Sequence, residues 1–151
     1  MLKTGATLPS FELPNQSGEL VNSRSWLGKP IVIFFYPKDN TPVCTVEACS
    51  FRDELENFQV MNAEIIGISS DSIMSHEEFA RKFRLSYSLL SDPEREVAEK
   101  FGLKNLLFGL LAPRATFVFD KEGILVETIS SRWNGKVHMK RALEILISLP
   151  D

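Results

Sequence analysis

Cysteine and histidine are scarce in this sequence, with two of each among its 151 residues. A structural zinc site takes about four ligands. The two cysteines and two histidines of the chain, Cys44, Cys49, His76 and His138, do not show metal-ligand spacing. The sequence therefore predicts no metal site.

Long apolar runs and clusters of one charge are missing as well. Apolar stretches reach only about five or six residues, too short to cross a bilayer, and the N-terminal segment has no run of signal-peptide length. The 17 Lys and Arg residues are scattered among 20 Asp and Glu residues, which argues against a nucleic-acid surface. We therefore predict a cytoplasmic protein without nucleic-acid or membrane partners. Stable disulfides are uncommon there, so two cysteines are more often redox-active, metal-binding or inert than structural.

The remaining composition is that of one soluble globular domain over residues 1–151, with 44% hydrophobic and 25% charged residues. Apolar and β-branched runs bounded by turn residues predict strands at 11–21 (a hairpin), 31–36, 64–69, 89–90, 115–119 and 124–129. Helical spacing and capping signals predict helices at 42–58, 75–83, 93–101 and 137–149. The main signals are Thr41 before Pro42, a capping box at 75–78 and a turn at 120–123.

This order of elements predicts an α/β fold. The first half requires a parallel β-α-β unit with a right-handed crossover, and the last part supplies an antiparallel hairpin with a covering helix. The result is a central mixed sheet with helices on both faces and an N-terminal β-hairpin. That arrangement matches a thioredoxin-like fold, which by itself does not reveal the function.

Cys44 lies in the first turn of the predicted helix that follows a buried strand. Unpaired backbone N–H groups and the positive end of the helix dipole meet there. Such surroundings stabilise a thiolate, which is the form of cysteine that attacks peroxides. Many cysteines are instead small buried hydrophobic residues, and the position of Cys44 alone leaves both interpretations open.

Two segments of the chain together carry a resemblance to a known family. Pro37, Thr41 and Cys44 are spaced as Pro-xxx-Thr-xx-Cys, within the run Thr-Pro-Val-Cys-Thr-Val-Glu-Ala-Cys-Ser-Phe-Arg-Asp. Further on, 113–120 reads Pro-Arg-Ala-Thr-Phe-Val-Phe-Asp. The chain resembles the peroxiredoxins, and within them the peroxiredoxin Q or bacterioferritin comigratory protein branch, from about residue 3 to its last helix.

The resemblance implies a thiol-dependent peroxidase that reduces hydrogen peroxide and organic hydroperoxides. It implies that Cys44 is the attacking cysteine, with Thr41 and Arg114 as polar partners and Pro37 as a shield. Two roles are open for Glu47: it is a first-turn acid that the helix dipole stabilises, or it holds Arg114. The reductant would be thioredoxin or a related dithiol protein, and the chain a monomer or weak homodimer. No cofactor is implied, because sulfur itself carries the redox change.

The resemblance also implies that Cys49 resolves oxidised Cys44 through a disulfide. On one regular helix, residues five apart have Cα atoms roughly 8 to 9 Å apart, whereas disulfides rarely exceed about 7 Å. The start of the helix would therefore have to unwind. The alternative is an inert Cys49 with an external thiol as resolver. A binding module and a protein disulfide reductase are the competing functions, and the spacing is not the Cys-x-x-Cys of the latter.

One residue departs from the family pattern, and one segment has two alternative interpretations. Val43 stands where this branch often has glycine, and a β-branched residue there would slow unwinding. Segment 103–112 is unusually apolar for a loop. It is either a short helix packed on the core or an apolar collar or self-association patch. We predict from the second alternative a preference for organic hydroperoxides that depends on Phe108. Trp26 and Trp133 are interpreted as packing residues.

Overall fold

The computed structural model describes residues 1–103, 114–131 and 133–150. Two antiparallel strands form the N-terminal hairpin, β1 (Glu12–Pro14) and β2 (Leu20–Asn22). The main strands are β3 (Ile31–Phe35), β4 (Glu64–Ser69), β5 (Ser88–Ser91), β6 (Ala115–Phe119) and β7 (Leu125–Ser130). The helices are α1 (Pro42–Asp53), α2 (Leu55–Val60), α3 (Ile73–Phe83), α4 (Glu96–Lys100) and α5 (Gly135–Ser148), with a 3-10 turn, η1 (Ser23–Trp26).

The main sheet has the strand order β5-β4-β3-β6-β7. Strands β3, β4 and β5 run parallel, while β6 is antiparallel to β3 and β7 is antiparallel to β6. The predicted mixed sheet, hairpin and thioredoxin-like arrangement are therefore confirmed. Because β3 pairs with β6, Phe35 lies opposite Ala115, so the end of β3 meets the beginning of β6.

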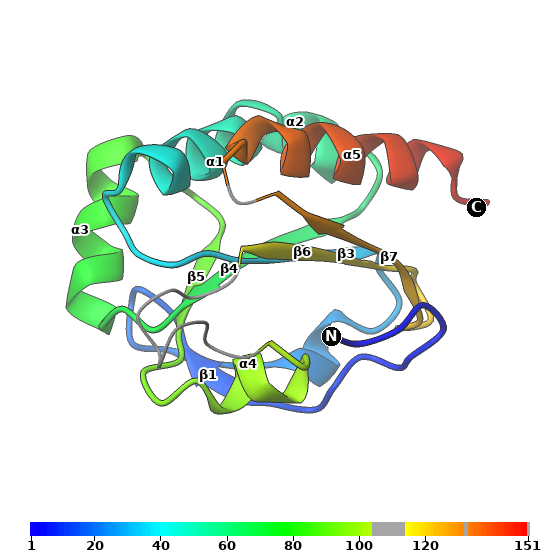
Figure 1. Cartoon of the computed structure of the whole chain (residues 1–151), viewed down its shortest axis with the longest axis horizontal. Helices are drawn as coiled ribbons and strands as arrows, with labels where there is room; N and C mark the ends of the chain where they lie inside the picture. Colours follow the sequence, from blue (N-terminus) through cyan, green and yellow to red (C-terminus); the bar gives the residue numbers. More distant parts are fainter. Residues whose placement is uncertain (104–113, 132, 151) are drawn as a thin grey trace.

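Helices cover both faces of the sheet (Figure 1), and an apolar core lies between the sheet and the elements on each face. Side chains alternate along β3, as the period of a strand requires. Val32, Phe34 and Tyr36 face the core shared with α1, α2, α3 and α5. Ile31, Ile33 and Phe35 face the core shared with α4, η1 and the N-terminal segment. The fully buried β3 explains why its sequence is a continuous apolar run rather than an alternating one.

Several helix boundaries differ from the prediction. The helix expected over 42–58 is divided into α1 and α2, because the backbone of Glu54 between them is not helical. Helix α3 begins at Ile73, and its cap is Ser72, whose side chain accepts a hydrogen bond from the Ser75 backbone N–H. The predicted capping box at 75–78 was wrong, because the Ser75 hydroxyl instead donates to Asp39.

The last two helices are also shifted. Helix α4 is shorter than predicted because the Asp92 carboxylate accepts hydrogen bonds from the first-turn N–H groups of Val97 and Ala98. Helix α5 begins at Gly135, where Asn134 caps it through the backbone N–H of Val137. None of the described helices combines the length and the apolar character that a membrane span requires.

The two tryptophans have different surroundings. Trp26 is buried and packs edge-on against the ring of Phe11, which confirms it as a packing residue. Trp133 is 80% exposed, so the same interpretation was wrong for Trp133. The apolar segment 103–112, with Phe108, lies outside the described residues apart from buried Leu103, and both of its interpretations stay predictions.

Candidate active site

Cys44 is the third residue of α1 and is 1% exposed. Thr41 occupies the N-cap position with extended backbone, and Pro42 begins the helix, as predicted. The backbone carbonyl of Thr41 accepts the helical hydrogen bond of Thr45 at 2.8 Å. Cys44 therefore lies in the first helical turn, where backbone N–H groups have no helical acceptor. This position was predicted from the sequence.

Arg114 precedes β6 and reaches Cys44 across the end of β3. Its Nη2 lies 3.1 Å from Cys44 Sγ, and its Nη1 donates to Glu47 Oε1 at 2.6 Å. All three side chains are buried. The antiparallel pairing of β3 with β6 brings the two segments together, since the strand that leads to Cys44 ends where the strand after Arg114 begins. One guanidinium thus contacts both the sulfur and a carboxylate.

Glu47 lies in the second turn of α1, whose first turn contains no acidic residue. The interpretation of Glu47 as a first-turn acid was therefore wrong, and the alternative contact with Arg114 is the one observed. Burial raises the pKa of Glu47 from 4.5 to about 8, although the charge and the hydrogen bonds of Arg114 act to lower it. The cost of removing the carboxylate from water outweighs the nearby positive charge.

Sequence reasoning missed the third neighbour of this cluster, His138 on α5. Its Nδ1 lies 2.7 Å from Thr116 Oγ1 and 3.5 Å from Glu47 Oε2. Helix α5 reaches Glu47 because Gly135 has no side chain: a Cβ there would lie 2.7 Å from the Glu47 backbone nitrogen. A signal was present in the sequence, since His138 is one of only two histidines and stands on the apolar side of a predicted helix.

The remaining predicted site residues, Thr41, Pro37 and Cys49, are near Cys44 in the chain, and none of them makes a hydrogen bond to its side chain among the described residues. Thr41 does not cap α1 through its side chain, and its hydroxyl instead donates to the Lys38 carbonyl at 2.8 Å. Pro37 is half-buried directly after Tyr36. Cys49 lies on α1 and is partly buried, and this burial raises the pKa of its thiol.

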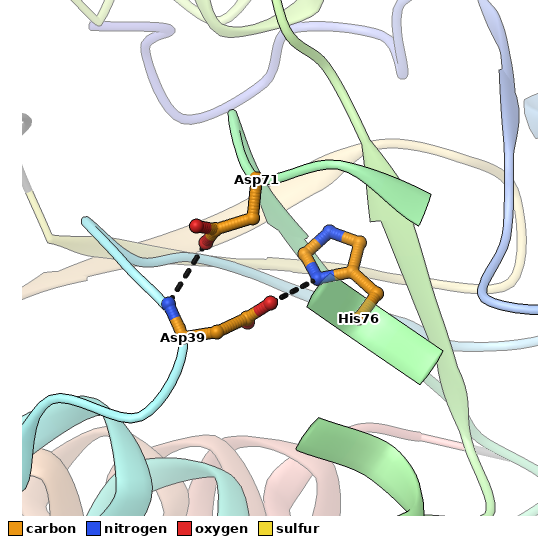
Figure 2. Close-up of side chains that lie close together, drawn as sticks. All are labelled: Asp39, Asp71 and His76. Carbon is orange, nitrogen blue, oxygen red and sulfur yellow. Dashed lines mark hydrogen bonds and ion pairs between the residues drawn. The ribbon is translucent and has the colours of Figure 1, made fainter. Parts of the chain in front are cut away.

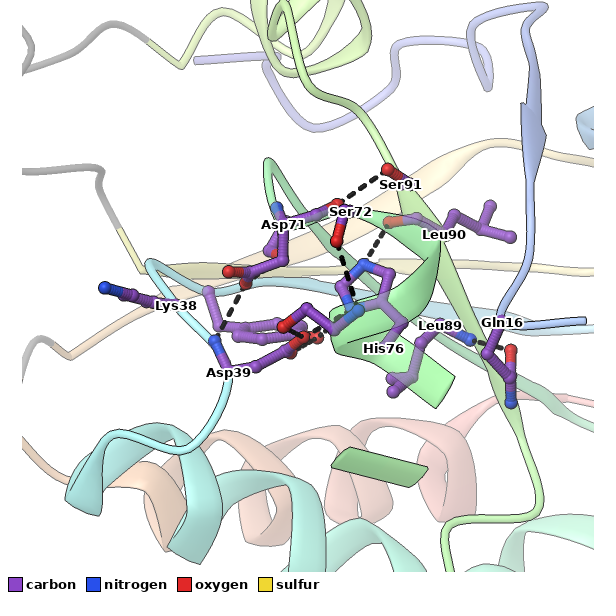
Figure 3. A network of polar contacts seen from close by, with 12 residues as sticks. Gln16, Lys38, Asp39, Asp71, Ser72, His76, Leu89, Leu90 and Ser91 are labelled. Atoms are coloured by element: carbon purple, nitrogen blue, oxygen red, sulfur yellow. Dashed lines mark hydrogen bonds and ion pairs between the residues drawn. The ribbon is translucent and has the colours of Figure 1, made fainter. Parts of the chain in front are cut away.

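A second polar cluster, formed by Asp39, Asp71 and His76, holds the loop between β3 and α1 (Figure 2). The Asp39 backbone N–H donates to Asp71 Oδ2 at 2.8 Å, and Asp39 Oδ2 lies 2.7 Å from His76 Nδ1. Figure 3 shows how the cluster extends to the strand ends, where His76 Nε2 lies 3.0 Å from the Leu90 carbonyl. The loop before the cysteine is thus tied to β4, α3 and β5.

The Asp39 carboxylate is saturated with donors. It also accepts hydrogen bonds from the Tyr36 hydroxyl at 2.6 Å and the Ser75 hydroxyl at 2.8 Å. Burial, followed by the charge of Asp39, raises the pKa of Tyr36 well above its ordinary value, so this hydroxyl keeps its proton. Asp39, Asp71 and His76 are close enough together to ligate a cation, but their oxygens already accept internal hydrogen bonds. We propose no metal there.

Comparison with known proteins decides the family of this arrangement. Residues 4–128 match the family model described as the AhpC/TSA family. The chain belongs to the AhpC/TSA family. It is 42% identical over 145 residues to the chloroplastic Peroxiredoxin Q of Sedum lineare, a match that covers 96% of this chain and 78% of the relative. The predicted resemblance to the peroxiredoxin Q branch is thereby confirmed.

Solved structures of this family share the fold. Peroxidoxin BcpB of Mycobacterium tuberculosis superposes with a TM-score of 0.93 at 40% identity and covers all of both chains. Bacterioferritin Comigratory Protein of Xanthomonas campestris superposes with a TM-score of 0.84 at 30% identity and covers 91% of this chain and 90% of that chain. As a member of this family, the chain is a thiol-dependent peroxidase that uses peroxide substrates and a thiol reductant, and its two cysteines fit the atypical two-cysteine type.

Proposed function

We propose that Cys44 attacks the peroxide and that Arg114, held by Glu47, stabilises the charge that develops in the attack. One observation carries this proposal: the same guanidinium lies 3.1 Å from the Cys44 sulfur and 2.6 Å from a Glu47 carboxylate oxygen. Arginine keeps its charge and presents donors in a fixed plane. It can therefore stabilise negative charge as it moves from sulfur to the departing oxygen.

The proposed substrates are hydrogen peroxide and organic hydroperoxides. The Cys44 thiolate forms a bond to one peroxide oxygen while the O–O bond breaks. The other oxygen leaves with the bonding electron pair, takes a proton from solvent, and becomes water or an alcohol. Cys44 is left as a sulfenic acid, oxidised by two electrons. The organic substrates are supported by the alkyl peroxide reduction named for the Xanthomonas campestris relative.

Thr41 and Pro37 complete the proposed site. The Thr41 hydroxyl donates its hydrogen to Lys38, so its oxygen can still accept a hydrogen bond from a bound peroxide. Pro37 has no backbone N–H. It can cover one side of the pocket without offering a donor that competes for the peroxide.

Cys49 is the proposed resolving residue, and it can act only if α1 opens. Both cysteines lie on α1, where regular helix geometry separates their Cα atoms by roughly 8 to 9 Å. Burial raises the pKa of Cys49 and so disfavours its thiolate, which argues against Cys49 as the attacker of peroxide. In the resolving step a Cys44–Cys49 disulfide forms and the sulfenic oxygen leaves as water. If Cys49 is inert, an external thiol takes its place.

The reductant, the assembly state and the location are also proposals. Thioredoxin or a related dithiol protein would reduce the disulfide by exchange, in line with the thiol reductant that the family uses. We propose a monomer or a weak homodimer in the cytoplasm. The chloroplastic location belongs to the Sedum lineare relative, and cell fractionation with an antibody against this chain tests the location directly.

Intact mass after one equivalent of hydrogen peroxide tests the two cysteine roles. We expect wild type to lose about two mass units and Cys49→Ser to gain about one oxygen. Cys44→Ser is the matched control and should not react. A gain of oxygen by Cys44→Ser would overturn the assignment of the attacker, and unchanged masses throughout would leave a thioredoxin-like binding module as the better explanation.

A further inference from the structure

His138 is fully buried, and its two ring nitrogens have different partners. Nε2 lies 2.8 Å from the Ser131 carbonyl oxygen, which can only accept, so Nε2 carries a hydrogen. Burial lowers the pKa of His138, and the ring is therefore neutral at pH 7. In a neutral ring the other nitrogen, Nδ1, is an acceptor. Nδ1 therefore accepts the hydrogen of the Thr116 hydroxyl, whose Oγ1 lies 2.7 Å away, and Glu47 Oε2 lies 3.5 Å from the same nitrogen.

Glu47 Oε2 is the one buried side-chain oxygen or nitrogen without a hydrogen-bond partner among the described residues. The other carboxylate oxygen, Oε1, accepts from Arg114. An ionised carboxylate with one oxygen unsatisfied, facing a ring nitrogen that offers it no hydrogen, is unfavourable in a dry interior. A proton on Oε2 removes this charge and makes Oε2 a donor toward Nδ1, whose lone pair it would share with the Thr116 hydroxyl.

We infer that His138 is a positioning residue of the peroxidase reaction, because it keeps a proton on Glu47 and so directs the charge of Arg114 toward Cys44. The inference rests on the proposed roles of Cys44 and Arg114. Among the described residues, the charged or titratable groups beside Glu47 are Arg114, His138 and the Tyr87 phenol, which donates to the Ala48 carbonyl. Arg114 links the carboxylate to Cys44. Lys136 on α5 is exposed to solvent.

The charges of the cluster explain why this proton matters for the reaction. With Glu47 and His138 neutral, the Arg114 cation balances the Cys44 thiolate. Loss of the Glu47 proton adds a negative charge 2.6 Å from the guanidinium, and that charge competes with the sulfur and the departing oxygen for Arg114. Because the pKa of Glu47 is raised to about 8, the loss takes place at mildly alkaline pH.

The first test reads the proton directly and does not depend on activity. The chain has only two histidines, so a long-range proton–nitrogen NMR spectrum of the reduced, full-length protein contains two imidazole rings. We expect His138 to be neutral with its hydrogen on Nε2, and its Nδ1 shift to move with a midpoint at about pH 8. In Glu47→Gln that movement should disappear. A doubly protonated His138 at pH 7, or the same titration in Glu47→Gln, would overturn the inference.

The second test measures the consequence for the reaction. Loss of the single Glu47 proton should lower kcat/KM of wild type by up to about tenfold between pH 7 and pH 9. His138→Asn offers an amide donor to Oε2, so the fall in kcat/KM should no longer lie between pH 7 and pH 9. His76→Asn, the matched loss of the other buried histidine, should keep the wild-type shape of the profile. A wild-type profile in His138→Asn would contradict the role of His138.

The two tests separate this inference from the proposed function. If peroxide leaves the mass of Cys49→Ser unchanged, the proposed role of Cys44 fails, while the NMR titration still decides where the proton lies. If the mass change occurs and the titration is absent in wild type, the peroxidase assignment stands and the role of His138 is wrong.

Discussion

The two histidines of the chain occupy two buried carboxylate pairs that differ in one respect. In the Asp39–His76 pair the facing atoms are 2.7 Å apart, and the carboxylate accepts from two hydroxyl groups as well. In the Glu47–His138 pair the facing atoms are 3.5 Å apart, and Glu47 Oε2 has no hydrogen-bond partner in the described structure. The carboxylate of the first pair thus has its hydrogen bonds, whereas the carboxyl group of the second pair, the incomplete pair, has one unsatisfied oxygen.

This difference indicates a structural role for the Asp39–His76 pair and a role in reactivity for the Glu47–His138 pair. A buried network with every group satisfied has one favourable arrangement, so it holds the loop before α1 in place. The buried carboxyl group of Glu47 has one unsatisfied oxygen and a pKa raised to about 8, so its protonated and ionised forms have similar free energy near that pH. The incomplete pair is the one that contacts Arg114 and, through it, Cys44. We therefore expect changes to the first pair to alter stability, and changes to the second to alter reactivity and its pH dependence.

The largest expected effect comes from Asp39→Asn. It removes the carboxylate that faces His76, and breaking a buried pair in this way costs about 3–5 kcal/mol of unfolding free energy. Urea denaturation at pH 7 measures the loss. Asp53→Asn is the matched control, because its side chain is 63% exposed and should change stability by less than about 1 kcal/mol. Similar small losses in both variants would show that the Asp39–His76 pair is not an anchor.

Arg114→Lys tests the incomplete pair. A lysine has one compact charge and cannot contact Cys44 and Glu47 with the geometry of a planar fork. Since one well-placed donor is worth about 10²–10³ in rate, kcat/KM for peroxide should fall by that factor while the fold is retained. Stopped-flow measurement of the reduced enzyme gives the value. Arg141→Lys, in an exposed pair with Glu127, should keep the wild-type rate, and a wild-type rate in Arg114→Lys would refute the role of the fork.

Glu47→Gln tests how the buried proton contributes to stability. The folded-state pKa is raised from 4.5 to about 8, so the folded protein binds more protons than the unfolded chain between these values. The contribution of Glu47 is fully present below pH 4.5 and is lost as pH rises to about 8, with a slope of at most about 1.4 kcal/mol per pH unit.

The window for that measurement lies above pH 6.5, because the lowered pKa of His138 opposes the trend below this value. We expect wild type to lose stability relative to Glu47→Gln between pH 6.5 and pH 8, as measured by urea denaturation. A constant difference between the two proteins over this range would mean that Glu47 is ionised throughout.

The smallest expected effect concerns the unwinding of α1. Glycine is a weaker helix former than valine by about 0.4 kcal/mol, so Val43→Gly should speed formation of the Cys44–Cys49 disulfide about twofold. Rapid quenching followed by mass analysis measures this rate. Val60→Gly, at the exposed end of α2, is the control. Hydrogen exchange should also show less protection of residues 42–51 after oxidation, and unchanged protection would exclude unwinding.

Much of the fold could be predicted from the sequence, because it depends on local pattern. The continuous apolar run of β3, Pro42 after Thr41, and the turn at 120–123 each use a signal within a few residues. Prediction failed where a distant partner decides. The start of α3 at Ile73 is an example, since the Ser75 hydroxyl that suggested a capping box donates to Asp39 instead.

The residues of the candidate site also fall into those that local motifs predicted and those that only the structure revealed. Cys44, Arg114 and Glu47 were selected from motifs, and the structure brings them into contact. His138 and Asp39 were not selected, although both are buried beside the segments that carry the motifs. No local pattern distinguishes a histidine that packs in a core from one that faces a carboxylate, because the difference lies in residues from other elements.

The sequence by itself determined the α/β fold class, the position of Cys44 at a helix start and the family resemblance. These depend on periodicity, helix capping and short motifs, which act over a few residues. Only the tertiary structure decided that Arg114 joins Cys44 to Glu47, that Glu47 lies beside His138, and that Asp39 anchors the loop. The physical reason is that desolvation and hydrogen-bond satisfaction are set by all neighbours in space, and these neighbours come from distant parts of the chain.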